Sequence, residues 1–167
     1  MSFSPIPQYS FQKLTDISPD YLERLGVRFL MLDLDNTIAS YRERLPSADV
    51  LRWASELIDR GIQLYMVTNS FRKRRVKPFA EALGIGVSMG AGKPSPKCII
   101  RAMEMTGHER CDSAFVGDQI FTDILSANRA GVVSIIVKPK HFTNPFLALR
   151  YGIEAPFRAM CKNIFRD

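Results

Sequence analysis

Acidic, hydroxyl and amide side chains of this 167-residue chain stand at the ends of apolar runs, where they could carry out phosphoryl transfer. Two aspartates at the end of the first run, Asp33 and Asp35, could supply a nucleophile and a proton-transfer group. A hydroxyl group and a lysine could bind the phosphoryl oxygens. The full set of candidate residues is Asp33, Asp35, Thr68, Asn69, Lys93, Asp118 and Asp123.

Four of these candidates are carboxylates, and we expect them at one rim of the fold. Carboxylates that lie close together repel one another unless a positive charge lies among them. A hard divalent cation that binds carboxylate oxygens and a substrate phosphate meets this need, and Mg²⁺ fits the pattern. The sequence therefore predicts a Mg²⁺ site among Asp33, Asp35, Asp118 and Asp123, with further positive charge from Lys93.

Strand-like and helix-like segments alternate through the middle of the chain. Short apolar runs predict strands over residues 27–34, 62–67, 85–89, 114–116 and 132–137. Between them, apolar residues recur at helical spacing. The clearest case follows the capping residue Ser47, with Val50, Trp53, Ala54 and Leu57 on one face.

Five strands joined by helical crossovers indicate an α/β fold. We expect a doubly wound, Rossmann-like, mostly parallel five-stranded sheet, whose ligands bind beyond the carboxyl ends of the strands. Residues 27–140 would form this core. Residues 1–26 would be an N-terminal extension with one short helix, and residues 141–167 a basic, aromatic C-terminal tail.

Composition narrows the class of protein. Hydrophobic residues make up 46% of the chain and charged residues 24%, which predicts one folded domain rather than a disordered chain. Three cysteines without a C-x-x-C pair argue against a disulfide framework or a cysteine-rich zinc site. Neither a membrane-spanning run nor a signal-peptide pattern is present, so we expect a cytoplasmic protein. The net charge of +6 favours anionic partners.

Four ordered motifs resemble those of the haloacid dehalogenase (HAD) superfamily. DLDNT, from Asp33 to Thr37, resembles the first motif, D-x-D-x-T. Thr68, Lys93 and the run GDQIFTD over residues 117–123 resemble the second, third and fourth. The LDLDNT start, VTNS, the GKPSP loop and the basic tail also resemble the YqeG family of subclass IIIA phosphatases. That family is similar to the mitochondrial phosphatidylglycerophosphate phosphatase of fungi.

This resemblance implies roles for the four aspartates. Asp33 would attack phosphorus and form an aspartyl-phosphate. Asp35 would protonate the leaving alkoxide and then deprotonate the attacking water. Mg²⁺ would be held by Asp33, the backbone carbonyl of Asp35 and Asp118, with Asp123 orienting its water shell.

The resemblance also implies which residues hold the phosphoryl group. The Thr68 side chain, the Asn69 backbone and Lys93 would bind the phosphoryl oxygens. Lys97 lies one helical turn beyond Lys93, so the sequence leaves open which of the two lysines serves.

The spacing of the motifs leaves no room for a cap domain. Only 30 residues separate Thr37 from Thr68, and 23 separate Asn69 from Lys93. An uncapped site would be closed by a large substrate, by another subunit in a homo-oligomer, or by a membrane.

The C-terminal tail bears on that choice. Aromatic and basic residues interleave over residues 141–167, as in segments that lie at a lipid interface, although the same residues could instead pack on the core. Pro145, Gly152 and Pro156 predict that this segment is not one long helix. A second basic cluster, residues 72–77, follows the second motif and could face the same headgroups.

The sequence therefore predicts a Mg²⁺-dependent phosphomonoester hydrolase. The resemblance favours phosphatidylglycerophosphate as substrate, with peripheral contact at the inner face of the membrane. The alternatives are a phosphatase of a soluble sugar or nucleotide phosphate and a basic protein that binds nucleic acid or ribosomes. The complete motifs argue against nucleic acid as a partner.

Overall fold

A single parallel sheet forms the centre of the computed structural model, which describes residues 4–141 and 145–165. Within these residues the sheet has seven strands in the order β4-β3-β2-β5-β6-β1-β7, and every neighbouring pair is parallel. The strands are β1 (Tyr9–Phe11), β2 (Phe29–Leu32), β3 (Gln63–Val67), β4 (Gly86–Ser88), β5 (Ser113–Gly117), β6 (Val133–Val137) and β7 (Asn163–Ile164).

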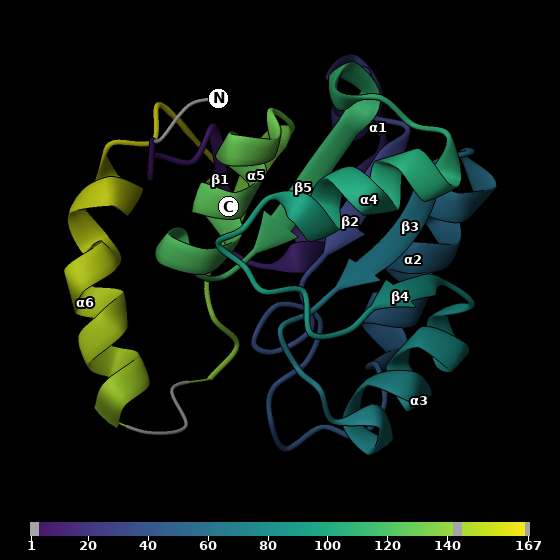
Figure 1. Cartoon of the computed structure of the whole chain (residues 1–167), viewed down its shortest axis with the longest axis horizontal. Coiled ribbons are helices and arrows are strands. Elements are labelled where there is room, and N and C mark those ends of the chain that lie inside the picture. The colour runs from purple at the N-terminus through teal and green to yellow at the C-terminus, as the bar shows by residue number, and fades with distance from the viewer. Residues whose placement is uncertain (1–3, 142–144, 166–167) are drawn as a thin grey trace.

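Helices cover both faces of this sheet (Figure 1). Those nearest the sheet are α1 (Pro19–Arg24), α2 (Ala48–Asp59), α3 (Lys73–Leu83), α4 (Lys97–Thr106) and α5 (Leu125–Ala130). Helices α1, α2 and α3 pack on the face formed by Leu30, Leu64 and Val116, whereas α4 and α5 pack on the face formed by Met31 and Phe115. Because β2, β3 and β5 are buried on both faces, their sequences are nearly continuous apolar runs.

The doubly wound parallel fold predicted from the sequence is confirmed, but the sheet has more than the five predicted strands. The two additional strands, β1 and β7, come from the terminal segments and extend the sheet beyond β6. They span three and two residues, which is too short for a recognisable apolar pattern. The predicted N-terminal helix is α1, capped by the side chain of Ser18.

The C-terminal segment contains one helix, α6 (Pro145–Ala159), so the prediction that prolines interrupt it is wrong. Pro145 stands at the first helical position, where a backbone N–H is not needed, and Pro156 lies in the last turn. Leu147 and Glu154 are buried, and Phe157 packs against a small isoleucine cluster, so one face of α6 is held by the core. The tail residues Phe142 and Arg166 lie outside the described residues.

The other face of α6 is apolar and exposed. It carries Phe146, Leu149 and Ile153, which are between 57% and 69% exposed, and the exposed Met160 directly follows the helix. In the part of the chain that the structure describes, no helix is long and apolar enough to cross a bilayer.

Candidate active site

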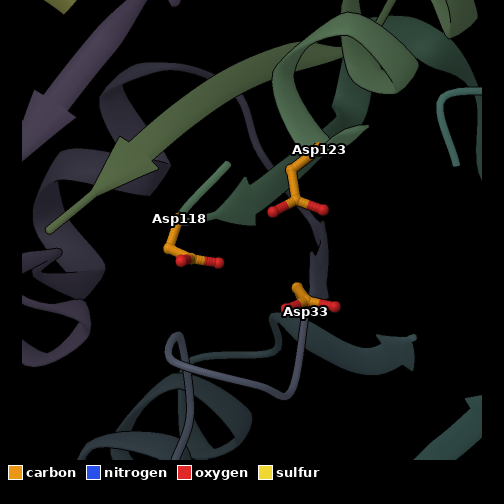
Figure 2. Close-up of side chains that lie close together, drawn as sticks. All are labelled: Asp33, Asp118 and Asp123. Atoms are coloured by element: carbon orange, nitrogen blue, oxygen red, sulfur yellow. The ribbon is translucent and has the colours of Figure 1, made fainter. Parts of the chain in front are cut away.

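Three buried aspartates meet at the carboxyl end of the sheet. Asp33 follows β2 and Asp118 follows β5, which is the neighbouring strand in register with it. Asp123 lies in a π-helical turn, Ile120–Ile124, that returns toward the same place. One carboxylate oxygen from each of the three lies within 4.8 Å of the others, and Figure 2 shows the side chains converging on a common space.

A buried lysine neutralises part of this cluster. The ammonium group of Lys93 lies 2.6 Å from Asp33 Oδ1 and 2.8 Å from Asp123 Oδ1, and it also donates to the Val67 carbonyl at 3.0 Å. Lys93 is therefore the lysine that the fold brings to the carboxylates. Lys97 stands exposed at the start of α4.

Burial and neighbouring charges together shift the pKa values of these groups. Burial raises the pKa of Asp33 to about 7; Lys93 opposes this rise and Asp123 adds to it. The pKa of Asp118 is also raised well above its usual value, by burial and then by repulsion from Asp123 and Asp33. Burial alone would lower the pKa of Lys93, but the two carboxylates in contact with it outweigh that effect and raise it. One ammonium group thus leaves the three carboxylates short of positive charge.

The donor set fits a hard divalent cation. Both carboxylate oxygens of Asp118 are buried without a hydrogen-bond partner among the described residues, and the nearest guanidinium, that of Arg150, is 3.9 Å away. Buried carboxylate oxygens are expected to have partners, and oxygen ligands are those that Mg²⁺ prefers. Asp33, Asp118 and Asp123 would hold such an ion.

The predicted phosphate-binding residues Thr68 and Asn69 follow the carboxyl end of β3, at the same edge of the sheet as the aspartates. Thr68 is buried directly after the strand, and its hydroxyl oxygen accepts the Ser70 N–H at 3.1 Å. The Asn69 side chain pairs with the backbone of Lys93: Oδ1 accepts its N–H at 2.8 Å, and Nδ2 donates to its carbonyl at 3.1 Å. Asn69 therefore fixes the loop that presents Lys93.

Asp35 lies apart from the carboxylate cluster. Its side chain accepts two hydrogen bonds from Arg75 on α3, at 3.2 Å from Nε and 3.1 Å from Nη2, both on Oδ1. Arg75 also donates to the carbonyls of Ser40 and Glu43. The prediction for Asp35 as a metal ligand concerns its backbone carbonyl, and it stays a prediction.

Sequence reasoning missed Arg75 and the support that α6 gives to Asp118. Arg75 lies in the basic cluster 72–77, which has no feature that distinguishes one arginine from the next. On α6, Arg158 donates to the Asp118 carbonyl and lies 3.2 Å from Glu154, and Arg150 lies 3.8 Å from the same glutamate. The i,i+4 spacing of these three residues is a signal that could have indicated the ion pairs.

Comparison with known proteins decides the family. Residues 9–131 match the family model of haloacid dehalogenase-like hydrolases. The chain belongs to this family. It is 32% identical over 142 residues to the protein named "Probable phosphatase YqeG" from Bacillus subtilis (strain 168), covering 85% of this chain and 82% of that protein. This similarity confirms the resemblance to the YqeG family.

Further similarities are more distant. The glyceraldehyde 3-phosphate phosphatase of Methanopyrus kandleri is 29% identical over 101 residues, covering 56% of this chain and 43% of that protein. The 3-deoxy-D-manno-octulosonate 8-phosphate phosphatase of Moraxella catarrhalis, solved in complex with a magnesium ion, a phosphate ion and a KDO molecule, superimposes with a TM-score of 0.57. That match is 16% identical and covers 92% of this chain and 83% of the other, so it supports the fold alone.

Substitution of Gly117 tests whether the position of Asp123 controls cation binding. A Cβ at Gly117 would lie 2.4 Å from Asp123 Cβ and Cγ, so Gly117→Ala must displace the carboxylate. We expect the affinity for Mg²⁺, measured by isothermal titration calorimetry, to fall about 10- to 100-fold, as for the loss of a residue that orients a metal ligand.

A matched control is Gly152→Ala on α6, where a Cβ meets no heavy atom within 4 Å. Its Mg²⁺ affinity is expected to equal that of the wild type. Wild-type affinity in Gly117→Ala, with circular dichroism showing an intact fold, would contradict the assigned cation site.

Proposed function

We propose that this chain is a Mg²⁺-dependent phosphomonoester hydrolase that acts through a phosphorylated Asp33. The observation that carries the proposal is the convergence of Asp33, Asp118, Asp123 and Lys93 at one end of the sheet in a HAD-family hydrolase. Two relatives whose names describe them as phosphatases support it.

The proposed reaction divides the work between the two aspartates of the first motif. A carboxylate oxygen of Asp33 attacks phosphorus, and the bond from phosphorus to the ester oxygen breaks as Asp35 gives that oxygen a proton. Asp35 then takes a proton from the water that attacks the phosphorus of phospho-Asp33. Inorganic phosphate leaves and the Asp33 carboxylate is regenerated.

Positive charge and hydrogen-bond donors around Asp33 would stabilise the transferring phosphoryl group. Lys93 is fixed beside Asp33, and the Thr68 hydroxyl can donate to a phosphoryl oxygen while it accepts the Ser70 N–H. Mg²⁺ held by the three buried aspartates would supply further charge to offset that of the phosphoryl oxygens.

Phosphatidylglycerophosphate is the substrate that we propose, bound at the inner face of the membrane. The segments between Thr37 and Thr68 and between Asn69 and Lys93 hold only loops, α2, β3, α3 and β4, so no cap covers the site. The exposed apolar face of α6 and the basic cluster 72–77 are suited to a lipid surface that carries negative charge.

A soluble phosphorylated metabolite is the alternative substrate. The named activity of the Methanopyrus kandleri relative, on glyceraldehyde 3-phosphate, favours it. In that case a second copy of the chain could complete the uncapped site.

Replacement of the proposed acid separates the two steps of the reaction. Asp35→Asn cannot give a proton, so hydrolysis of an alkyl phosphate is expected to slow by roughly 10² to 10⁴. Nitrophenol leaves without a proton, so rapid-quench kinetics with nitrophenyl phosphate should show a first turnover near the wild-type rate, followed by slow release of phosphate. The exposed Asp59→Asn serves as the control. An equal loss in the first turnover of both substrates would contradict the role of Asp35.

The proposed substrate can be tested with a panel of phosphomonoesters. We expect phosphate release to be fastest from phosphatidylglycerophosphate in anionic vesicles, compared with sugar and nucleotide phosphates. Leu149→Gln/Ile153→Gln should reduce hydrolysis in vesicles more than hydrolysis of nitrophenyl phosphate, because both side chains lie on the exposed face of α6. Met105→Gln, an exposed apolar residue of α4, is the control. Faster turnover of a sugar phosphate would favour the alternative.

A further inference from the structure

A groove beside the site is lined by guanidinium groups. It lies between the loop that precedes α2 and the beginning of α3. We call this feature the arginine groove and define it by five of its lining residues: Arg42, Arg44, Arg72, Arg74 and Arg75.

Most of the charge in the arginine groove is uncompensated. Arg42, Arg44, Arg72 and Arg74 are exposed, and none of them forms an ion pair with a carboxylate among the described residues. The acidic residue in the lining, Glu43, accepts the Ser40 N–H and pairs with Lys140 at 3.5 Å. Arginines gathered in this way repel one another and favour an anion among them, and guanidinium groups bind phosphate with two hydrogen bonds.

Arg75 lies both in the lining of the arginine groove and in contact with Asp35, the proposed proton donor. Its guanidinium lines the groove and donates two hydrogen bonds to Asp35 Oδ1, and its position is fixed further by the Ser40 carbonyl and the ring of Phe79. Both bonds fall on Oδ1, which leaves Oδ2 for a substrate oxygen. Since Asp35 is the proposed proton donor to the ester oxygen, the groove begins where the leaving group must lie.

We infer that the arginine groove binds a second phosphoryl group, one carried by the leaving group of the substrate. The inference rests on the proposed function and adds a subsite for the leaving group: the preferred substrate is a phosphomonoester whose alcohol bears a phosphodiester, as in phosphatidylglycerophosphate, or another phosphate. Arg72 and Arg74 bind this group directly, and Arg75 positions Asp35 at the entrance to the groove.

The test compares substrates with and without the second anion. The soluble pair is 1,3-propanediol monophosphate and 1,3-propanediol bisphosphate, and the lipid arm is phosphatidylglycerophosphate in neutral detergent micelles. We expect the wild type to show a kcat/KM at least about tenfold higher for the doubly anionic substrates than for the monophosphate, as one charge-assisted contact allows.

Two double variants distinguish a local contact from overall charge. Arg72→Gln/Arg74→Gln removes two groove residues. Lys73→Gln/Lys77→Gln removes the same charge from the same helix at exposed residues outside the groove lining. We expect the arginine variant to lose about 10- to 100-fold in kcat/KM for the doubly anionic substrates, mostly through KM, and far less for the monophosphate. The lysine variant should keep the wild-type ratio between the substrates.

Each outcome decides between the possibilities. If only the lipid has a higher kcat/KM than the monophosphate, and the arginine variant loses this difference, the groove recognises the phosphodiester of a lipid headgroup. If the bisphosphate also has a higher kcat/KM than the monophosphate, the groove recognises any second phosphate. Equal losses with all substrates, equal losses in the two variants, or no wild-type preference would overturn the inference.

Failure of the proposed function has a separate signature. If the wild type hydrolyses no phosphomonoester, nitrophenyl phosphate included, the proposed function fails, and calorimetric binding of the bisphosphate then tests the groove. A dissociation constant at least about tenfold weaker in the arginine variant than in the lysine variant would retain the groove as an anion site, and equal constants would reject it.

Discussion

The contact on which the site depends is the buried ion pair between Lys93 and the two carboxylates of Asp33 and Asp123. Charges taken out of water are costly, and they persist only where the partners are held at short distance and are hydrogen-bonded. Here the ammonium group lies within 2.8 Å of both carboxylates and also donates to a backbone carbonyl. The loop that carries Lys93 is fixed in turn by the side chain of Asn69. The two carboxylate oxygens of Asp118 have no hydrogen-bond partner among the described residues, and a cation bound between the three aspartates would satisfy them.

The fold gives the two aspartates of the first motif different surroundings. Asp33 is buried with Asp118, Asp123 and Lys93, whereas Asp35, two residues later, lies in the turn after β2 and is bound by Arg75 of α3. Two carboxylates so close in sequence can serve different steps because their environments differ. Support for the site therefore comes from three directions: the strand ends, α3 through Arg75, and α6 through Arg158 at the Asp118 carbonyl.

Sequence could predict the parts of the site that follow from the parallel sheet. The apolar runs of β2 and β5 place Asp33 and Asp118 at one edge, since parallel strands share a carboxyl end. It could not select Arg75 from a run of five basic residues within positions 72–77, because the choice depends on how α3 packs beside the turn that holds Asp35. The terminal strands β1 and β7 and the continuous helix α6 escape prediction for a related reason: they form by pairing and packing with residues distant in sequence, rather than from local patterns.

Chemical trapping of the intermediate can establish whether Asp33 carries the phosphoryl group. Asp35→Asn slows release of the intermediate, so this variant can be mixed with nitrophenyl phosphate and Mg²⁺ and quenched with sodium borohydride, which reduces an acyl phosphate to an alcohol. Peptide mass spectrometry is then expected to find homoserine at position 33 only when substrate is present. Reduction at Asp118 or Asp123 instead, or a burst of nitrophenol with Asp33 unmodified, would contradict this role of Asp33.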